Sequence, residues 1–114
     1  MTKPLGPYTP IVRSGELLFV SGQVGLRGGA LVDGGVAEQA EQALSNLAEL
    51  LRSEGATMSD VVKTTVFLVD MADYGAMNEV YVAAFGDHRP ARSAVAVAQL
   101  PIGARVEIEA IARG

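Results

Sequence analysis

The sequence predicts an α+β fold in which two helices cover one face of a mixed β-sheet. Two segments repeat apolar residues every three or four positions, as amphipathic helices do, and the segments around them are short and rich in β-branched residues, as strands are. The predicted order is strand, strand, helix, strand, helix, strand, strand. With 114 residues, 49% of them hydrophobic and 19% charged, the chain suits a single domain over residues 1–114 with a substantial core.

The first predicted element is a β-hairpin over residues 9–20. Its two apolar runs, residues 10–12 and 17–20, are separated by Ser14-Gly15-Glu16, a triplet that favours turns. Glycines then indicate a tightly turned loop, at positions 22, 25, 28 and 29. This stretch lacks the Gly-Lys-Ser/Thr ending of a P-loop and the GxGxxG spacing of a dinucleotide site, so we exclude nucleotide binding.

The first helix is predicted over residues 36–54. Gly55 ends it, and Asp33 or a neighbouring glycine caps its start. Its apolar stripe consists of Val36, Ala40, Ala43, Leu44, Leu47 and Leu51. The opposite side of this helix is charged and needs no functional interpretation.

The second helix is predicted over residues 74–85, after Asp70 and Asp73 and before Gly86. Its apolar and aromatic stripe consists of Tyr74, Met77, Tyr81, Ala84 and Phe85. Such a stripe can contact a cofactor, but helical spacing favours a packing face, and we assign it to the core.

The remaining strands follow from β-branched and alternating patterns. Residues 60–69 are dense in β-branched side chains and are predicted to form a long, buried, central strand. Two more strands are predicted over residues 92–99 and 105–113, joined by a hairpin or small loop at residues 100–103. Both faces of the 92–99 strand are largely apolar, although two helices can cover only one face of the sheet. We therefore expect other copies of the chain to cover the second face, in a homo-oligomer.

Charge and composition exclude several classes of partner and site. The net charge of −4 and the pI near 4.8 disfavour a nucleic-acid partner, because the chain would repel a phosphate backbone. No cysteine is present, which excludes disulfides and thiolate chemistry and fits a cytoplasmic location. No stretch has the apolar length of a signal peptide or a membrane span, so no membrane partner is expected. The lone His88 has no second histidine to complete a metal site, so we interpret it as an ordinary loop residue.

Arg92 and Glu107 are the candidate reactive residues. Arg92 stands at the start of one predicted strand and Glu107 in the next, and we expect these strands to be neighbours in the sheet. A guanidinium can bind a carboxylate through two hydrogen bonds, and a nearby glutamate can hold or activate water, which suits hydrolysis of a small anionic molecule. Glu109 lies on the same strand face as Glu107, about 7 Å along the strand. The alternatives are a salt bridge from Arg92 to either glutamate, and a solvated strand face for the two glutamates.

Several short motifs occur in order along nearly the whole chain: Leu5-Gly6-Pro7-Tyr8, Val20-Ser21-Gly22-Gln23, Val62-Lys63-Thr64-Thr65-Val66-Phe67, Pro90-Ala91-Arg92-Ser93 and Glu107-Ile108-Glu109-Ala110-Ile111-Ala112. Together with the element order, these motifs resemble the RidA/YjgF family. The resemblance implies a chorismate-mutase-like α+β fold. It also implies a homotrimer whose sheets pack into a central barrel, with ligand clefts where the subunits meet.

The resemblance further implies an enzyme that hydrolyses reactive 2-imino and enamino acids to 2-keto acids and ammonia; 2-aminoacrylate and its tautomer 2-iminopropanoate are examples. By the family's pattern, Arg92 would bind the substrate carboxylate, and Glu107 would position the attacking water or relay a proton. Tyr8 would line the cleft, although packing alone is the alternative for it. Ser21 and Asn78 would hold substrate or water by hydrogen bonds. No metal or organic cofactor is required.

Two features depart from the family pattern. Ala94 occupies a position where many members have cysteine, and the loop at residues 86–89 is shorter than in the best-known members. A small-carboxylate-binding or sensing protein without turnover is therefore an alternative to the deaminase. A ribonuclease is a further alternative, which the acidity of the chain and the lack of a histidine pair disfavour.

Overall fold

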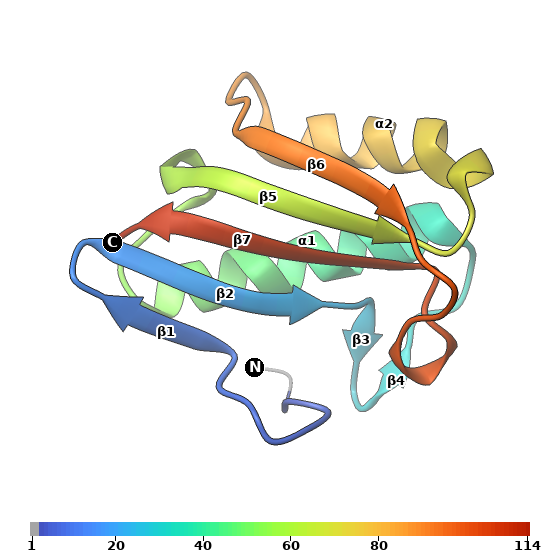
Figure 1. The fold of residues 1–114 in the computed structure, drawn as a ribbon, viewed down its shortest axis with the longest axis horizontal. Helices are drawn as coiled ribbons and strands as arrows, with labels where there is room; N and C mark the ends of the chain where they lie inside the picture. Colours follow the sequence, from blue (N-terminus) through green and yellow to red (C-terminus); the bar gives the residue numbers. More distant parts are fainter. Residues whose placement is uncertain (1–2) are drawn as a thin grey trace.

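The structure, a computed structural model, describes residues 3–114, which form a five-stranded sheet with two helices packed on one face (Figure 1). The strands of this sheet are β1 (Ile11–Ser14), β2 (Leu17–Gln23), β5 (Val61–Leu68), β6 (Ala91–Ala96) and β7 (Val106–Arg113). The helices are α1 (Val36–Ser53) and α2 (Tyr74–Phe85). The predicted order of helices and strands is confirmed, with bounds that agree to within a few residues.

The sheet has the strand order β1-β2-β7-β5-β6. Neighbouring strands are antiparallel except β5 and β6, which are parallel because α2 carries the chain back between them. The sheet is therefore mixed, as predicted. β7 is its middle strand, and β5 lies between β7 and β6, so the predicted position of residues 60–69 in the interior of the sheet is confirmed.

Of the two connections predicted between β6 and β7, a hairpin or a small loop, the hairpin is wrong, because β5 lies between these two strands. Residues 97–105 instead cross the end of β5, where Val97 N donates to Leu68 O at 2.7 Å and Val69 N donates to Arg105 O at 3.3 Å. In its place between β2 and β5, β7 forms hydrogen bonds along both of its edges. Paired with β6 at the outer edge of the sheet, β7 would form hydrogen bonds along one edge only.

Helix α1 begins after Gly35, and the carboxylate of Glu38 accepts a hydrogen bond from Gly35 N at 2.7 Å. A glycine is thus the cap, one of the two predicted possibilities. All members of the predicted apolar stripe are buried. Gln39 is buried as well, which the stripe did not indicate, and its Oε1 accepts a hydrogen bond from Arg105 N at 2.8 Å. This bond ties α1 to the start of β7.

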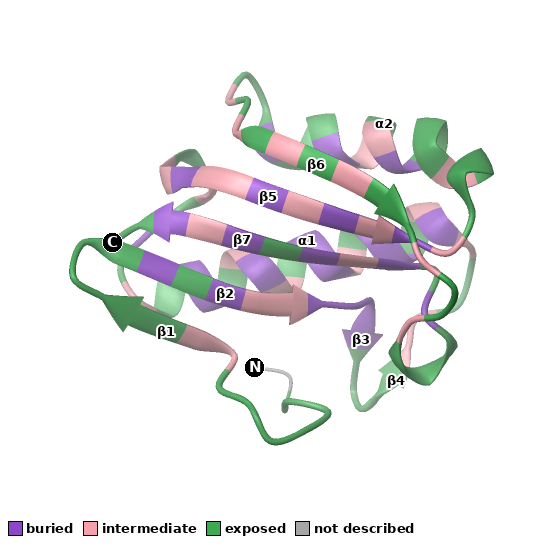
Figure 2. Cartoon of the chain, viewed as in Figure 1, coloured by how far each residue is buried: buried purple, intermediate pink, exposed green. Residues whose placement is uncertain are grey.

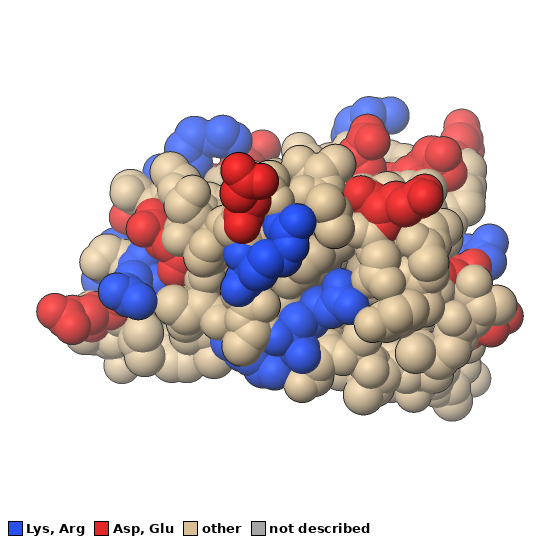
Figure 3. Space-filling view, turned by 90° about the horizontal axis from the view of Figure 1, so that it is seen from above, with Lys and Arg blue, Asp and Glu red and all other residues tan. Residues whose placement is uncertain are grey.

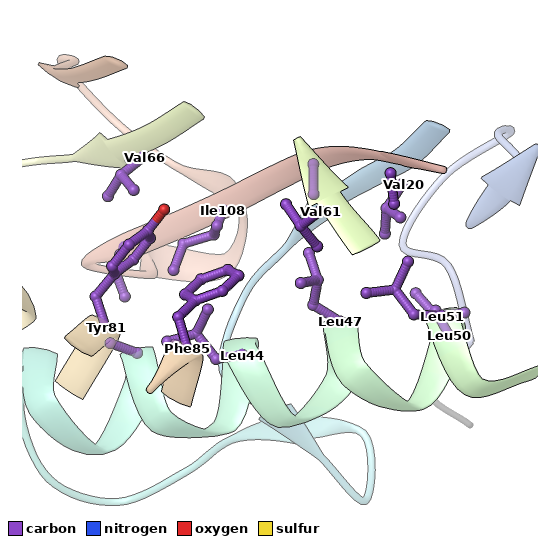
Figure 4. Close-up of a cluster of buried hydrophobic side chains, with 14 of the residues drawn as sticks. Val20, Leu44, Leu47, Leu50, Leu51, Val61, Val66, Tyr81, Phe85 and Ile108 are labelled. Carbon is purple, nitrogen blue, oxygen red and sulfur yellow. The ribbon is translucent and has the colours of Figure 1, made fainter. Parts of the chain in front are cut away.

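Helix α2 buries Met77, Tyr81 and Phe85 against α1 and the sheet, where the rings of Tyr81 and Phe85 lie between the helix layer and the strands (Figure 4). Tyr74 and Ala84, predicted for the same stripe, are exposed instead. The reason is that α2 packs beside α1 at the edge of the sheet, so a narrower strip of its surface faces the core. Neither helix within residues 3–114 has the length and apolar character needed to cross a membrane.

A second, short hairpin lies outside the sequence prediction, formed by β3 (Leu26–Arg27) and β4 (Ala30–Leu31). Gly28 and Gly29 form its turn with φ of +63° and +85°, the left-handed values that a two-residue primed turn requires. The sequence indicated this turn correctly. Strands of two residues are too short to show an alternating pattern, so the sequence could not indicate β3 and β4.

The sheet face opposite the helices is uncovered in the single chain (Figure 2). Val12, Leu17, Phe19 and Val95 present large apolar side chains there, each between 38% and 47% exposed. The register places Val12 beside Phe19 on adjacent strands. The prediction that apolar side chains are left on the second face is thus confirmed, and they share this face with Lys63 and Glu109.

Candidate active site

Arg92 lies on β6, an edge strand, and its side chain points to the helix side of the sheet. The register pairs Arg92 with Thr64, which is fully buried beneath the helices. Arg92 Nη2 donates a hydrogen bond to the Tyr74 hydroxyl at 2.9 Å. Arg92 Cζ lies 5.4 Å from the ring centre of Tyr74 and 4.8 Å from that of Tyr81, within the range of cation–π attraction. Within residues 3–114 the other N–H groups of this guanidinium have no partner, so they can bind a carboxylate.

Helix α2 supplies the surroundings of Arg92. Tyr74, Asn78 and Tyr81 are spaced by four and three residues, so they share one face of the helix. The Tyr81 hydroxyl shares a 2.7 Å hydrogen bond with Thr64 Oγ1, and burial raises the pKa of Tyr81. The Oδ1 atom of Asn78 is buried and has no hydrogen-bond partner among residues 3–114, so its capacity to accept a hydrogen bond is unused in the single chain. We refer to Arg92, Tyr74, Asn78 and Tyr81 as the cationic half-site.

Glu107 lies on the uncovered face of the sheet. Its neighbours in β7, Val106 and Ile108, are fully buried on the helix side, so the alternation of the strand turns Glu107 the other way. The Glu107 side chain is half-buried and forms no hydrogen bond or ion pair within residues 3–114. Burial raises the pKa of Glu107, and the negative charge of Glu109 raises it further. A raised pKa makes the carboxylate of Glu107 a stronger proton acceptor than an ordinary glutamate.

Gly22 leaves the space that the Glu107 carboxylate occupies, since a Cβ at this position would stand 2.2 Å from Glu107 Oε2. Tyr8, Gly22 and Glu107 help to line a small cavity of about 40 Å³, with room for a water molecule. The Tyr8 hydroxyl accepts a hydrogen bond from Leu5 N at 3.2 Å, which folds the ring back onto its own segment. We refer to Glu107, Gly22 and Tyr8 as the carboxylate half-site.

Ser21 does not line this small cavity. Its Oγ donates to Thr9 O at 2.8 Å and its backbone N donates to Pro10 O at 2.9 Å, which fastens the segment before β1 to β2. The side chain borders a hollow on the sheet face together with Phe19 and Glu109. The structure therefore gives Ser21 a part in placing the N-terminal segment of the carboxylate half-site.

The expectation that Arg92 and Glu107 lie on neighbouring strands is wrong. β5 separates their strands, and the two side chains point to opposite faces of the sheet. The salt-bridge alternative is not found either, because within residues 3–114 Arg92 forms no ion pair with Glu107 or Glu109. A single chain therefore cannot hold one small molecule between this guanidinium and this carboxylate.

Sequence reasoning missed three members of the half-sites: Tyr74 and Tyr81, which it assigned to the core, and Gly22. For Tyr74 a signal existed, because it stands four residues before Asn78 and so shares its helix face. For Gly22 no signal existed beyond its conformational freedom. Its role depends on the register of β2 against β7, which shifts between Val20 and Gln23 and brings Gly22 beside Glu107.

No group of three His, Cys, Asp or Glu side chains within residues 3–114 is placed to hold a metal ion. His88 Nε2 lies 2.6 Å from Val61 O, a hydrogen bond that fastens the loop after α2 to the start of β5. This contact agrees with the interpretation of His88 as an ordinary loop residue.

Comparison with known proteins assigns the family. The model of the family described as Endoribonuclease L-PSP matches residues 1–114. The chain belongs to this family. Among L-PSP relatives, the 2-iminobutanoate/2-iminopropanoate deaminase of Mus musculus is 53% identical over 110 residues, which cover 95% of this chain and 82% of the mouse protein. The deaminase of Homo sapiens is 47% identical, with 95% of this chain and 80% of the human protein covered.

Solved structures of the L-PSP family share the fold. A putative endoribonuclease from Thermotoga maritima is 49% identical, with a TM-score of 0.94 over 98% of this chain and 90% of that one. The YjgF gene product of E. coli is 40% identical, with a TM-score of 0.91 over 96% and 90% of the two chains. E. coli TdcF with bound serine is 37% identical, with a TM-score of 0.92 over 97% and 91%. The resemblance to the RidA/YjgF family is thereby confirmed.

Proposed function

We propose that the chain hydrolyses small 2-imino acids, such as 2-iminopropanoate and 2-iminobutanoate, to 2-keto acids and ammonia. The observation that carries the proposal is the cationic half-site, where a guanidinium with free N–H groups shares a helix-side location with a buried amide oxygen that lacks a partner among the described residues. A 2-imino acid presents a carboxylate and an N–H on adjacent carbons, and these are the kinds of group that a guanidinium and an amide oxygen bind. Relatives near 50% identity carry the name of this activity, and TdcF holds serine, another small carboxylate.

The proposed chemistry needs orientation and one proton relay. Arg92 binds the carboxylate and thereby fixes the imine carbon, while Asn78 Oδ1 accepts a hydrogen bond from the imine N–H. Water adds to the imine carbon as the C=N electrons move to nitrogen, and the nitrogen takes up a proton. The resulting carbinolamine then transfers its hydroxyl proton, through Glu107, to the nitrogen; the C–N bond breaks, ammonia leaves, and the keto group remains. Glu107 accepts the proton from water and returns it to nitrogen, so one water is consumed for each ammonia released.

The opposite directions of the two half-sites suggest how they meet. In the proposed homotrimer, the uncovered sheet faces pack inward as a central barrel, and the cationic half-site of one subunit meets the carboxylate half-site of the next. Two observations support this assembly. Arg92 lies on the edge strand β6, where a neighbouring copy can approach, and Phe19 and Val95 leave apolar surface for a partner to cover.

Mixing two inactive variants tests the proposal. Arg92→Ala removes the guanidinium and Glu107→Gln removes the carboxylate. With 2-aminoacrylate generated in situ at a concentration well below KM, each variant alone should retain about one hundredth of the wild-type rate or less. When the two are co-expressed in equal amounts, about one quarter of the clefts in randomly mixed trimers should combine an intact Arg92 with an intact Glu107. Keto-acid formation should then return to about one quarter of the wild-type rate.

The matched control mixes wild type with a chain that carries both substitutions. A cleft shared between subunits predicts about one quarter of the wild-type rate in this mixture as well, whereas a site within one chain predicts about one half. No recovery in the first mixture would contradict the shared cleft. A wild-type rate equal to the uncatalysed rate would contradict the deaminase assignment itself.

A carboxylate-binding or sensing protein is the second candidate, favoured by Ala94, whose methyl group packs against the core where many family members have a thiol. Such a protein would be stabilised against heat by 2-ketobutyrate without accelerating imine hydrolysis. An RNA-cleaving role has less support, because positive and negative side chains both occur on the face formed by β6 and α2 (Figure 3), and the net charge is −4. We place the reaction in the cytoplasm and assign it no metal or organic cofactor.

A further inference from the structure

We infer that Tyr74 is a positioning residue, whose hydroxyl aims the Arg92 guanidinium at the substrate carboxylate and so favours anionic over neutral ligands. The inference rests on the proposed function and deepens it. Tyr74 itself does not touch the reacting atoms, and its effect passes through Arg92.

The geometry fixes Arg92 from two directions. The Tyr74 hydroxyl accepts a hydrogen bond from Nη2 at 2.9 Å, while the Tyr74 and Tyr81 ring centres lie 5.4 and 4.8 Å from the guanidinium carbon. The rings attract the cation without setting the rotation of its plane, because cation–π attraction tolerates many orientations. The hydrogen bond is directional, so it is the contact that sets where the remaining N–H groups point.

The position of Tyr74 does not serve core packing. Its side chain is 38% exposed, whereas Met77, Tyr81 and Phe85 on the same helix are 0%, 4% and 6% exposed. The Tyr81 hydroxyl forms its hydrogen bond with Thr64 in the core, whereas the Tyr74 hydroxyl accepts its hydrogen bond from Arg92. A phenylalanine at position 74 would keep the ring and lose only this contact.

Holding the Arg92 guanidinium in place before the ligand arrives matters, because a free arginine side chain has many rotamers. The entropy lost when binding selects one of these rotamers weakens affinity. A neutral ligand gains little from the aimed guanidinium, since it lacks the charge that makes bidentate pairing strong. The hydroxyl of Tyr74 should therefore act on discrimination between a carboxylate and its amide, rather than on binding in general.

Tyr74→Phe tests the inference through the dissociation constants of 2-ketobutyrate and its neutral amide, measured by calorimetry. We expect the 2-ketobutyrate constant to rise about fivefold, which is about 1 kcal/mol at 1.36 kcal/mol per tenfold change. The amide constant should change by less than about twofold, and KM for the imine should rise while kcat stays within about twofold. A merely structural role would lower the melting temperature and leave the ratio of the two constants unchanged.

A double-mutant cycle assigns the effect to Arg92. In an Arg92→Ala background, Tyr74→Phe should leave 2-ketobutyrate binding unchanged, because the group it aims is gone. Equal or tighter keto-acid binding by Tyr74→Phe would overturn the inference, and the Arg92→Ala rates would still decide the proposed function. If the wild type binds the keto acid but hydrolyses no imine, the proposed function fails while the ratio of constants still decides the role of Tyr74. If the wild type binds no keto acid, both fail.

Discussion

The two half-sites of this chain are built in different ways. In the cationic half-site, Arg92 is held by a hydrogen bond and two aromatic rings on the helix side of the sheet. In the carboxylate half-site, Glu107 has no bonded partner among residues 3–114 and is accommodated by the missing side chain of Gly22 on the uncovered face. Under the proposed function, the chain organises the carboxylate anchor by itself, whereas Glu107 becomes organised only in the proposed assembly. Substitutions confined to one half-site should therefore have different effects on ligand binding and on turnover.

The largest effect is expected from Arg92→Ala. Losing a bidentate, charge-assisted anchor should lower kcat/KM for a 2-imino acid by about a thousandfold, mainly through KM. Steady-state kinetics with imine generated in situ would measure this loss. Arg92→Lys is the matched control, because it keeps the positive charge but lacks the planar guanidinium. Its kcat/KM should lie between those of the wild type and Arg92→Ala. Unchanged kinetics in Arg92→Ala would place the anchor elsewhere.

Glu107→Gln should lower kcat by about a hundredfold, because it removes the proton acceptor while leaving the ligand's anchor in place. The dissociation constant of 2-ketobutyrate should stay within about twofold of the wild-type value. Single-turnover rates and calorimetry on one preparation would separate the two quantities. A parallel loss of binding would mean that the half-sites do not divide recognition from proton transfer.

Gly22→Ala should lower kcat by about tenfold, because the added Cβ would stand 2.2 Å from Glu107 Oε2 and push the carboxylate aside. Gly75→Ala is the matched control, since nothing lies within 4 Å of its added Cβ and its φ is not in the left-handed region. We expect Gly75→Ala to keep wild-type kinetics and to raise the free energy of unfolding by about 0.5–1 kcal/mol. Equal kinetics for the two alanine variants would contradict the role assigned to Gly22.

The smallest effect is a shift in pH dependence caused by Glu109→Gln. The negative charge of Glu109 helps to raise the pKa of Glu107, so its removal should lower that pKa. Glu107 must be ionised to accept a proton, so activity falls as the pH drops through its pKa. The acid limb of kcat/KM should therefore move to lower pH in the variant. An Arg92 from a neighbouring copy would lower the pKa in both proteins alike, so a limb that stays in place or moves upward would contradict the coupling.

The helices and strands were predictable because their signals are local. The stripe of α1, the β-branched run of β5 and the alternation of Glu107 with Ile108 in β7 each depend on residues only a few positions apart. Strand order depends on contacts far apart in sequence, which explains why β7 was placed beside β6 instead of between β2 and β5.

The candidate site shows the same limit. Arg92 and Glu107 stood out by residue type, but which face each occupies depends on the register of β6 and β7 against β5. The Tyr74 to Arg92 hydrogen bond joins residues 18 positions apart, and it needs both the crossover and the exact start of α2. Residue types therefore indicated candidate groups, whereas their separation between the two faces of the sheet required the structure.

The placement of Arg92 at the free edge of the sheet also bears on when activity begins. If each cleft needs groups from separate copies, a newly synthesised chain is inactive until it assembles with other copies. Turnover would then respond steeply to how much of the protein a cell makes, with almost none at low expression and a sharp onset once the association threshold is crossed.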